Sequence, residues 1–285
     1  MYPKIVFLGM GFYEIFLTLG MLTALYLGDK LGIKRGLSVK AQRLLIIGGV
    51  IGVLLGLFGA MAFQAFYDYL ATKEFHLFSS GLTFYGGLIF GAAAFLLIWF
   101  VGGNMKGISA ETKAKFKDVA DIAACVVPLA HGLGRFGCLF AGCCHGKATN
   151  AWYGVTHYGV TTSGELISLG KYVPVQLFEA VFLLALSAVL FYLFFKRTDE
   201  KRIPLLPVYC IAYAIWRFLI EYARADDRGV TIIPGLTPSQ LTAVVLCLVG
   251  IGYFVVWYVG KKKTAACQGE SVDGVAEKTQ ENKEE

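Results

Sequence analysis

An arginine and a glutamate lie in the last part of a single apolar segment, residues 204–223, and a second arginine directly follows it. Arg217, Glu221 and Arg224 stand at positions i, i+4 and i+7, a spacing that places three side chains on one stripe of a helix. The stripe carries two positive charges and one negative charge, so it is cationic and contains a predicted ion pair. Guanidinium groups bind a phosphate through two parallel hydrogen bonds. The stripe is therefore a candidate anion site.

A further arginine lies in the glycine-rich segment 131–146, HGLGRFGCLFAGCCHG. His131 precedes Arg135 by four residues, so the two side chains share one face of a helix. Glycine-rich, irregular backbone at membrane depth is tolerated only where it is buried in protein or lines a water-filled cavity. Arg135 is therefore a candidate functional charge.

Three cysteines and a histidine crowd the end of the same segment: Cys138, Cys143, Cys144 and His145. Thiolates and an imidazole can bind a soft metal such as zinc, although the spacing C-x4-C-C-H matches no standard metal motif. In an oxidising exterior the same thiols can form a disulfide or a redox pair. A structural role, in which small side chains fill a tight turn, is the third interpretation. All three stay open at this point.

The composition indicates a lipid environment for the elements that carry these residues. The chain has 285 residues, of which 56% are hydrophobic and 16% charged, whereas soluble domains carry about 25% charged residues. Seven apolar runs reach the roughly 20 residues that a membrane-spanning helix needs. They cover about 6–27, 44–67, 81–103, 119–140, 175–195, 204–223 and 237–260. The sequence predicts an all-α, polytopic membrane helix bundle with seven transmembrane spans in one domain, 1–263, followed by a disordered cytoplasmic tail, 264–285.

Positive charge alternates between the segments that join the spans. Sixteen Lys and Arg residues follow spans one, three, five and seven, and six lie in the other segments. Basic residues near span ends stay in the cytoplasm, so the N-terminus is predicted outside and the C-terminus inside. This topology brings nearly all polar residues of the spans to the outer half of the bilayer, beside a long aromatic connection at 145–173. The sequence therefore predicts a site that faces the outer leaflet.

Four short motifs occur in order along the chain. GRFGCLFAGCCHGKAT resembles GRxGNFxNGExxGxxT, the signature of the prolipoprotein diacylglyceryl transferase family. TFYGGLIFG resembles the family's HGG motif, VPVQLFEA resembles its HPSQLYEA motif, and WRFLIEYAR resembles its RFxxEFxR motif. The match covers most of the chain from the third span onward, with a looser fit around GFYEIF in the first span.

The resemblance implies a multi-pass enzyme of the bacterial cytoplasmic (inner) membrane with seven spans and an outer N-terminus. Enzymes of this family transfer the diacylglyceryl group of phosphatidylglycerol to the lipobox cysteine thiol of a prolipoprotein and release glycerol phosphate. The implied partners are phosphatidylglycerol, prolipoprotein signal peptides that carry a lipobox, and membrane lipid. No cofactor, no metal ion and no nucleic acid is expected.

The positions of residues within these motifs imply their roles. Arg135 and Arg217 would bind and polarise the phosphate, because positive charge favours the negative charge that develops on the leaving group. The residues assigned to substrate binding are Tyr13, Gly134, Gly137, Gly142, Gly146, Gln176, Glu221 and Arg224.

The chain departs from the family pattern inside these motifs. Tyr85 stands in place of the family's histidine, and two asparagines and a glutamate are replaced by Cys138, Ala141 and Cys143. Because the thiolate is the nucleophile, a base is needed, and we hypothesise that His131 supplies the missing imidazole with an unperturbed pKa near 6.5. Tyr85, with an ordinary pKa of about 10, is expected to act in catalysis through hydrogen bonds.

Other functions are compatible with the same residues. A relative of the family could act on a different lipid or acceptor, and the cysteine cluster could make the chain a membrane redox or metal-binding protein. An anion transporter or channel could also use the arginines. The chain shows no internal repeat of the kind found in many transporters, and its polar groups are confined to the outer half, which argues against a path through the membrane.

Overall fold

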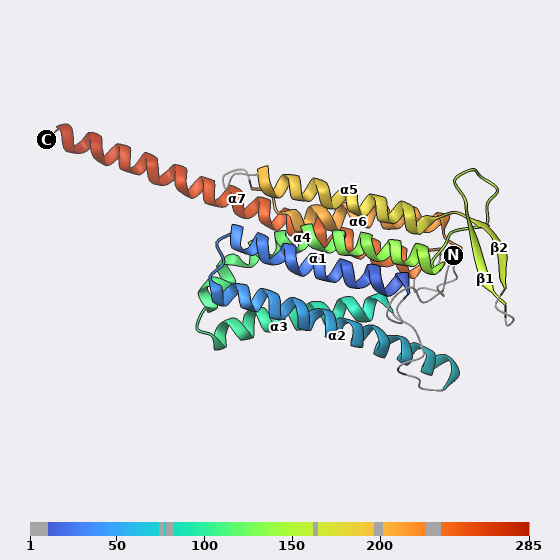
Figure 1. Ribbon diagram of the computed structural model, residues 1–285. Helices are drawn as coiled ribbons and strands as arrows, with labels where there is room; N and C mark the ends of the chain where they lie inside the picture. The colour runs from blue at the N-terminus through green and yellow to red at the C-terminus, as the bar shows by residue number, and fades with distance from the viewer. Residues whose placement is uncertain are drawn as a thin grey trace. The chain divides into compact units, whose positions relative to one another are not determined.

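The computed structural model describes residues 11–73, 77, 83–161, 165–196, 202–225 and 235–284 (Figure 1). Within these ranges, the description does not extend to the side chains of residues 67, 70–72, 84, 85, 160, 166 and 263–284.

Seven long α-helices form the described part of the chain. They are α1 (Phe12–Lys34), α2 (Val39–Thr72), α3 (Phe84–Met105), α4 (Ser109–Ala141), α5 (Val175–Lys196), α6 (Leu205–Ile220) and α7 (Pro238–Glu284). Each contains a stretch that is long and apolar enough to cross a bilayer, and a helix satisfies its own backbone hydrogen bonds in lipid. The prediction of an all-α, seven-span membrane bundle is confirmed.

The chain divides into two compact units. The first comprises Met1–Arg197 and Ala223–Asp226, and the second comprises Thr198–Tyr222 and Asp227–Glu285. Helices α1 to α5 belong to the first unit, and α6 and α7 belong to the second.

Glycines on α2 and α3, in the first unit, allow the backbones of the two helices to pack in close contact. A Cβ atom added to Gly91 would lie 2.9 Å from the carbonyl oxygen of Gly52, and one added to Gly56 would lie 3.0 Å from that of Gly87. Small residues spaced by four let helices approach closely in lipid. A larger side chain at any of these positions would push the two helices apart.

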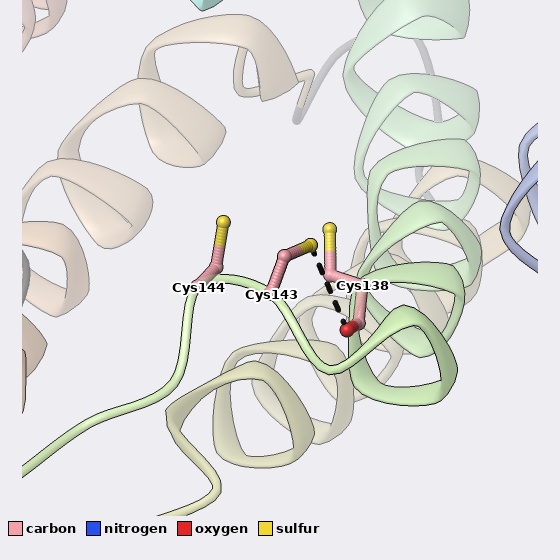
Figure 2. A group of neighbouring side chains, drawn as sticks. All are labelled: Cys138, Cys143 and Cys144. Atoms are coloured by element: carbon pink, nitrogen blue, oxygen red, sulfur yellow. Dashed lines mark hydrogen bonds between the residues drawn. The ribbon is translucent and has the colours of Figure 1, made fainter. Parts of the chain in front are cut away.

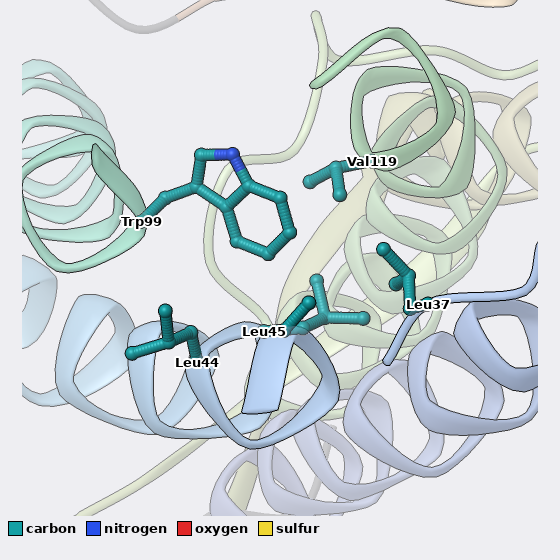
Figure 3. Packing of buried hydrophobic residues seen from close by; sticks show 6 residues of the cluster. Leu37, Leu44, Leu45, Trp99 and Val119 are labelled. Atoms are coloured by element: carbon teal, nitrogen blue, oxygen red, sulfur yellow. The ribbon is translucent and has the colours of Figure 1, made fainter. Parts of the chain in front are cut away.

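A hydrophobic core joins the start of α2 and of α4 to the end of α3 (Figure 3). Its buried residues include Leu37, Leu44, Leu45, Trp99 and Val119. The indole N–H of Trp99 donates a hydrogen bond of 3.0 Å to the carbonyl oxygen of Thr112, so this large side chain is buried without an unsatisfied donor. The core packs against the first part of α4. The predicted site residues of this helix, His131 and Arg135, lie toward its C-terminal end.

A β-hairpin follows α4 within the connection that the sequence predicts as a long aromatic segment. Strands β1 (Val155–Val160) and β2 (Leu166–Tyr172) pair antiparallel, with a register shift between His157 and Tyr158. The hairpin was not predicted. It adds a small two-stranded sheet to an otherwise helical chain and precedes the start of α5.

Helix α7 continues well beyond its apolar part. The span-like stretch is Pro238–Lys262, and the helix runs on to Glu284. The sequence predicts disorder for residues 264–285, because polar segments bury too little apolar surface to offset the entropy of ordering. Disorder of this tail stays a prediction.

Candidate active site

The glycine-rich segment ends α4 with a sharp change of direction. Helix α4 ends at Ala141, and Gly142 follows with φ +75°, in the left-handed region where a Cβ atom is unfavourable. The Gly142 N–H donates to the carbonyl oxygen of Leu139, and the Cys143 N–H donates to that of Cys138, both at 3.3 Å. Cys144 also adopts a left-handed conformation, with φ +59°. Glycine at 142 is therefore explained by the backbone of this turn.

The turn gathers three thiol groups (Figure 2). The Sγ atoms of Cys138, Cys143 and Cys144 all lie within 4.8 Å of one another, and none of the three is in a disulfide. Cys143 is exposed, and the other two are half-buried. The Cys143 thiol donates to the carbonyl oxygen of Cys138 at 3.7 Å. The three side chains form a compact cluster, which we call the thiol cluster.

The pKa values of Cys143 and Cys144, the two cluster residues that follow α4, are shifted in opposite directions. Hydrogen bonds from the Cys138 and Cys143 thiols lower the pKa of Cys144, and the positive charges of Arg135 and Arg224 act in the same direction. Hydrogen bonds with Cys138 and Cys144, together with burial, raise the pKa of Cys143. The arrangement therefore favours a thiolate at Cys144 that is held by a protonated neighbour.

Arg135 forms a two-point ion pair with a carboxylate on α5. Its Nε lies 3.0 Å from Oε2 of Glu179, and its Nη2 donates to Oε1 at 3.1 Å. His131 Nε2 lies 4.0 Å from the same Oε1 atom. The Glu179 side chain is fully buried, with 0% exposure. Glu179 thus contacts both His131 and Arg135, whose proximity was predicted. It is an ionisable residue of the predicted span 175–195 and was not among the predicted site residues.

The first turn of α5 also holds the thiol-bearing turn in place. Gln176 is fully buried, and its Nε2 donates to the carbonyl oxygen of Cys143 at 2.6 Å. Glu179 follows Gln176 by three residues, so one face of α5 contacts both the backbone of the turn and the guanidinium of Arg135. The structure gives Gln176 a positioning contact within the protein.

Gly146 lies where three backbone segments of the first unit meet. Its N–H donates to the carbonyl oxygen of Val173 at 2.8 Å, and it forms an antiparallel bridge with Arg224. A Cβ atom at this position would lie 2.5 Å from the carbonyl oxygen of Ala223, so only glycine fits. Arg224 is buried, with 5% exposure.

Helix α1 crosses α4 at Gly137. A Cβ atom there would lie 3.1 Å from the carbonyl oxygen of Tyr13 and 3.3 Å from its Cα atom. At Gly134 an added Cβ would make only an ordinary contact of 3.9 Å with Leu17. Packing therefore explains Gly137, whereas it does not explain Gly134.

A second charged cluster lies in the unit formed by α6 and α7. Arg217 Nη1 lies 2.7 Å from Oε2 of Glu221, and Arg217 Nη2 donates to Oγ of Ser239 at 2.7 Å. The hydroxyl of Thr237 donates to Oε1 of Glu221 at 2.9 Å. The side chains of Arg217, Glu221 and Ser239 are all buried. The predicted ion pair between Arg217 and Glu221 is present.

The prediction that Arg224 continues the helical stripe of Arg217 and Glu221 is wrong. Helix α6 ends at Ile220 and gives way to a 3-10 turn, Glu221–Ala223. Arg224 therefore does not continue the helical face, because its backbone leaves the helix to bridge Gly146. Arg224 belongs to the first unit, with the thiol cluster.

The predicted site residues are thus described in two groups. His131, Arg135, Gln176, Arg224 and the glycines of the signature lie in the first unit, and Arg217 with Glu221 lies in the second. That Arg135 and Arg217 share one pocket stays a prediction. The side chain of Tyr85 lies outside the described residues. Sequence reasoning did not assign Glu179, Thr237 and Ser239 to the site, although each is polar and lies in or beside a predicted span.

A pair of histidines packs beside the thiol-bearing turn. The His145 ring centroid lies 4.3 Å from that of Tyr172 and 4.8 Å from that of His157, and Nδ1 of His145 lies 3.1 Å from the carbonyl oxygen of Gly146. His157 is 3% exposed, and burial lowers its pKa, with the nearby His145 acting in the same direction. These rings dock the hairpin onto the end of the glycine-rich segment.

A family model and individual relatives both match this chain, and both name the same family. Residues 3–256 match the family model of prolipoprotein diacylglyceryl transferases. A phosphatidylglycerol–prolipoprotein diacylglyceryl transferase of Clostridium tetani is 30% identical, over 85% of this chain and 91% of the relative. Transferase 2 of Clostridium perfringens is 28% identical, over 84% and 88%, and the Xylella fastidiosa (strain M23) enzyme is 30% identical, over 78% of both chains. This chain belongs to the prolipoprotein diacylglyceryl transferase family.

Proposed function

We propose that this protein transfers the diacylglyceryl group of phosphatidylglycerol to the lipobox cysteine of prolipoproteins in the bacterial inner membrane. The observation that carries the proposal is the family match over residues 3–256. The segments that hold Arg135 and Arg217 resemble two of the family's motifs, which supports the roles given to these residues. The relatives are named for the two substrates, phosphatidylglycerol and prolipoprotein.

The reaction transfers the diacylglyceryl group from a phosphate oxygen to a sulfur atom, and a negative charge passes from the thiolate to the leaving phosphate. The acceptor thiolate forms a bond to the terminal glyceryl carbon, and the bond between that carbon and the phosphate oxygen breaks. Glycerol phosphate leaves with the electron pair and gains a negative charge. Groups that bind this charge more strongly in the transition state than in phosphatidylglycerol accelerate the step. We assign this role to the guanidinium groups of Arg135 and Arg217.

The buried carboxylates support this assignment by fixing the arginines. Glu179 holds Arg135 at two points, and Glu221 with Ser239 holds Arg217. A guanidinium that is already oriented pays little entropy when phosphate arrives, and its electrostatic effect is stronger in a site with little water.

The acceptor thiol also has to lose a proton. His131 is our candidate base, and its proximity to Glu179 supports the role, because a carboxylate at 4.0 Å balances the charge of the imidazolium that forms. We expect Tyr13, Gln176, Glu221, Arg224 and the signature glycines to shape the binding site, and Tyr85 to donate a hydrogen bond.

Complementation provides the decisive experiment. A bacterium depleted of its own transferase receives this gene, and mass spectrometry looks for diacylglyceryl on a lipobox cysteine. The wild-type chain is expected to restore the modification, and Arg135→Ala and Arg217→Ala are expected to lower it by about a hundredfold or more. Arg43→Ala, an exposed arginine on α2, is the matched control. A membrane-inserted wild-type protein without transfer from phosphatidylglycerol to a lipobox would favour another lipid or acceptor.

A further inference from the structure

The thiol cluster has the dimensions of a metal site. A tetrahedral zinc ion holds thiolate sulfurs at about 2.3 Å, which places those sulfurs about 3.8 Å from one another. The three Sγ atoms of Cys138, Cys143 and Cys144 already lie within 4.8 Å of one another. To reach that spacing, the sulfurs have to approach one another by at most about 1 Å. Cys138 lies in the last turn of α4, and Cys143 and Cys144 directly follow the helix, so the three ligands come from one continuous segment.

The cluster supplies three ligands and leaves one side open. Cys143 is exposed, whereas Cys138 and Cys144 are half-buried. The neighbouring His145 packs its ring against Tyr172, and it does not belong to the group of ligand atoms that converge in the described residues. Structural zinc sites have four protein ligands, whereas catalytic sites have three and keep a position for substrate. The geometry corresponds to the second kind.

The surroundings of the cluster suit bound thiolates. Three thiolates and one Zn²⁺ ion leave one net negative charge, and Arg135 and Arg224 act on the cluster with positive charge. Gln176 fixes the backbone of the turn through its hydrogen bond to the Cys143 carbonyl oxygen. Contacts that hold a ligand's backbone and balance its charge are typical of the groups around functional metal sites.

We propose that Cys138, Cys143 and Cys144 bind one Zn²⁺ ion, and that the acceptor cysteine thiol of the substrate binds at its open fourth position. This inference rests on the proposed transferase function. Coordination is an alternative to His131 as the route to the thiolate, because it removes the thiol proton, which passes to solvent. The sulfur then uses a lone pair to bond the glyceryl carbon, while the carbon–oxygen bond breaks and glycerol phosphate leaves with the electron pair of that broken bond. The metal is neither oxidised nor reduced.

The departures from the family signature fit this inference. Cys138 and Cys143 stand where the signature has an asparagine and a glutamate, and Tyr85 stands where it has a histidine. A bound metal would remove the proton of the acceptor thiol. The chain would then not need the family's histidine for that step. The cysteine substitutions and the histidine loss then have one common explanation.

The metal site itself is tested without reference to activity. Purified full-length protein in detergent is reduced, stripped of metal and titrated with Co²⁺, whose absorption reports bound thiolates. We expect one equivalent to bind with a strong thiolate-to-cobalt band, and Zn²⁺ to displace it. The triple variant Cys138→Ser, Cys143→Ser, Cys144→Ser loses the band, and the control Cys210→Ser, Cys247→Ser, which alters half-buried cysteines elsewhere, retains it. A missing band, or one that survives the triple substitution, overturns the site.

The role of the fourth position is tested with acceptor peptides. A lipobox peptide with cysteine is expected to shift the cobalt spectrum, and a peptide with serine in its place is expected not to. Zinc removal is expected to cause a loss of transfer, and added Zn²⁺ is expected to restore it. Transfer that is unchanged after proven metal removal overturns the acceptor role. If transfer is absent in every metal state, the proposed function fails, while the cobalt titration still decides whether the site exists.

Discussion

At the scale of single residues, Glu179 connects two side chains that the sequence places on another helix. It contacts Arg135 at two points and lies 4.0 Å from His131. The sequence predicts that His131 and Arg135 share a face, because a spacing of four residues does so in any helix. It could not assign Glu179 as their partner, because that contact depends on how α4 and α5 pack. An ionisable residue within a predicted span was the available signal.

Replacement of Glu179 tests how far the arginine depends on its partner. Glu179→Gln keeps the size of the side chain but removes the negative charge from a fully buried site, so Arg135 loses the carboxylate that it contacts at two points. Breaking a buried ion pair costs about 3–5 kcal/mol of stability. We expect a lower thermal unfolding temperature and a loss of transfer. Glu165→Gln, an exposed residue before β2, should change neither, and an unaltered Glu179→Gln protein would contradict the role of the pair.

His131 is tested at the same scale. If His131 is the general base, His131→Ala lowers the transfer rate by about 10²–10⁴-fold with little change in stability, as measured by lipidation of a lipobox peptide. His145→Ala serves as the comparison, since His145 lies in the same unit but contacts aromatic rings. Undiminished lipidation by His131→Ala rules the hypothesis out and leaves coordination at the thiol cluster as the route to the thiolate.

At the scale of elements, hydropathy predicts helices well, and the connections poorly. Apolar runs of about 20 residues identified all seven helices, because lipid admits few other structures. The same signal missed the hairpin, because Val155–Val160 and Leu166–Tyr172 are short and contain glycine and lysine. It also extended α6 too far, because hydropathy does not distinguish an α-helix that ends at Ile220 from the 3-10 turn that follows it.

Two glycines of α4 form a matched pair for mutagenesis. Gly137→Ala forces α1 and α4 apart at Tyr13, whereas Gly134→Ala meets only ordinary contact. We expect Gly137→Ala to lower stability by about 1–3 kcal/mol, the usual cost of overpacking, and Gly134→Ala to leave it unchanged. If Gly134 contacts substrate, its alanine variant still loses transfer. Equal stability of the two variants in thermal unfolding would contradict the close crossing of α1 and α4.

The hairpin should respond to pH through His157. Burial lowers the pKa of His157 in the folded protein, so below about pH 6.5 the unfolded segment binds a proton that the folded one does not. Stability of the hairpin is therefore complete above that pH and falls as the pH decreases through it. Hydrogen exchange of the β1 and β2 amides, corrected for its intrinsic pH dependence, should report the change. His157→Gln should reduce the slope, and an unchanged slope would contradict this account.

At the scale of the whole molecule, the proposed chemistry draws on both units. Arg135 is paired within the first unit and Arg217 within the second. The sequence identified both arginines as functional charges from their depth and from their motifs. The spacing of four residues predicted the pairing of Arg217 with Glu221, but the sequence could not predict Glu179 as the partner of Arg135, because that pairing depends on tertiary packing.

A double-mutant cycle tests whether the two arginines act on one phosphate. Arg135→Ala and Arg217→Ala are each expected to lower transfer by about a hundredfold, and the double variant is expected to lose less than the product of the two effects. Groups that contact the same charge are coupled, whereas distant, independent groups are additive. Strict additivity in kcat/KM would contradict a shared phosphate.

The backbone just after the 3-10 turn is bonded to the glycine-rich segment. Gly146 forms a bridge with Arg224, and the Lys147 N–H donates to the Ala223 carbonyl oxygen at 3.0 Å. These contacts lie three and four residues after Cys143 in the chain. The Lys147 amide proton is therefore a probe: its exchange with solvent should accelerate in any variant that loosens the backbone next to the thiol cluster.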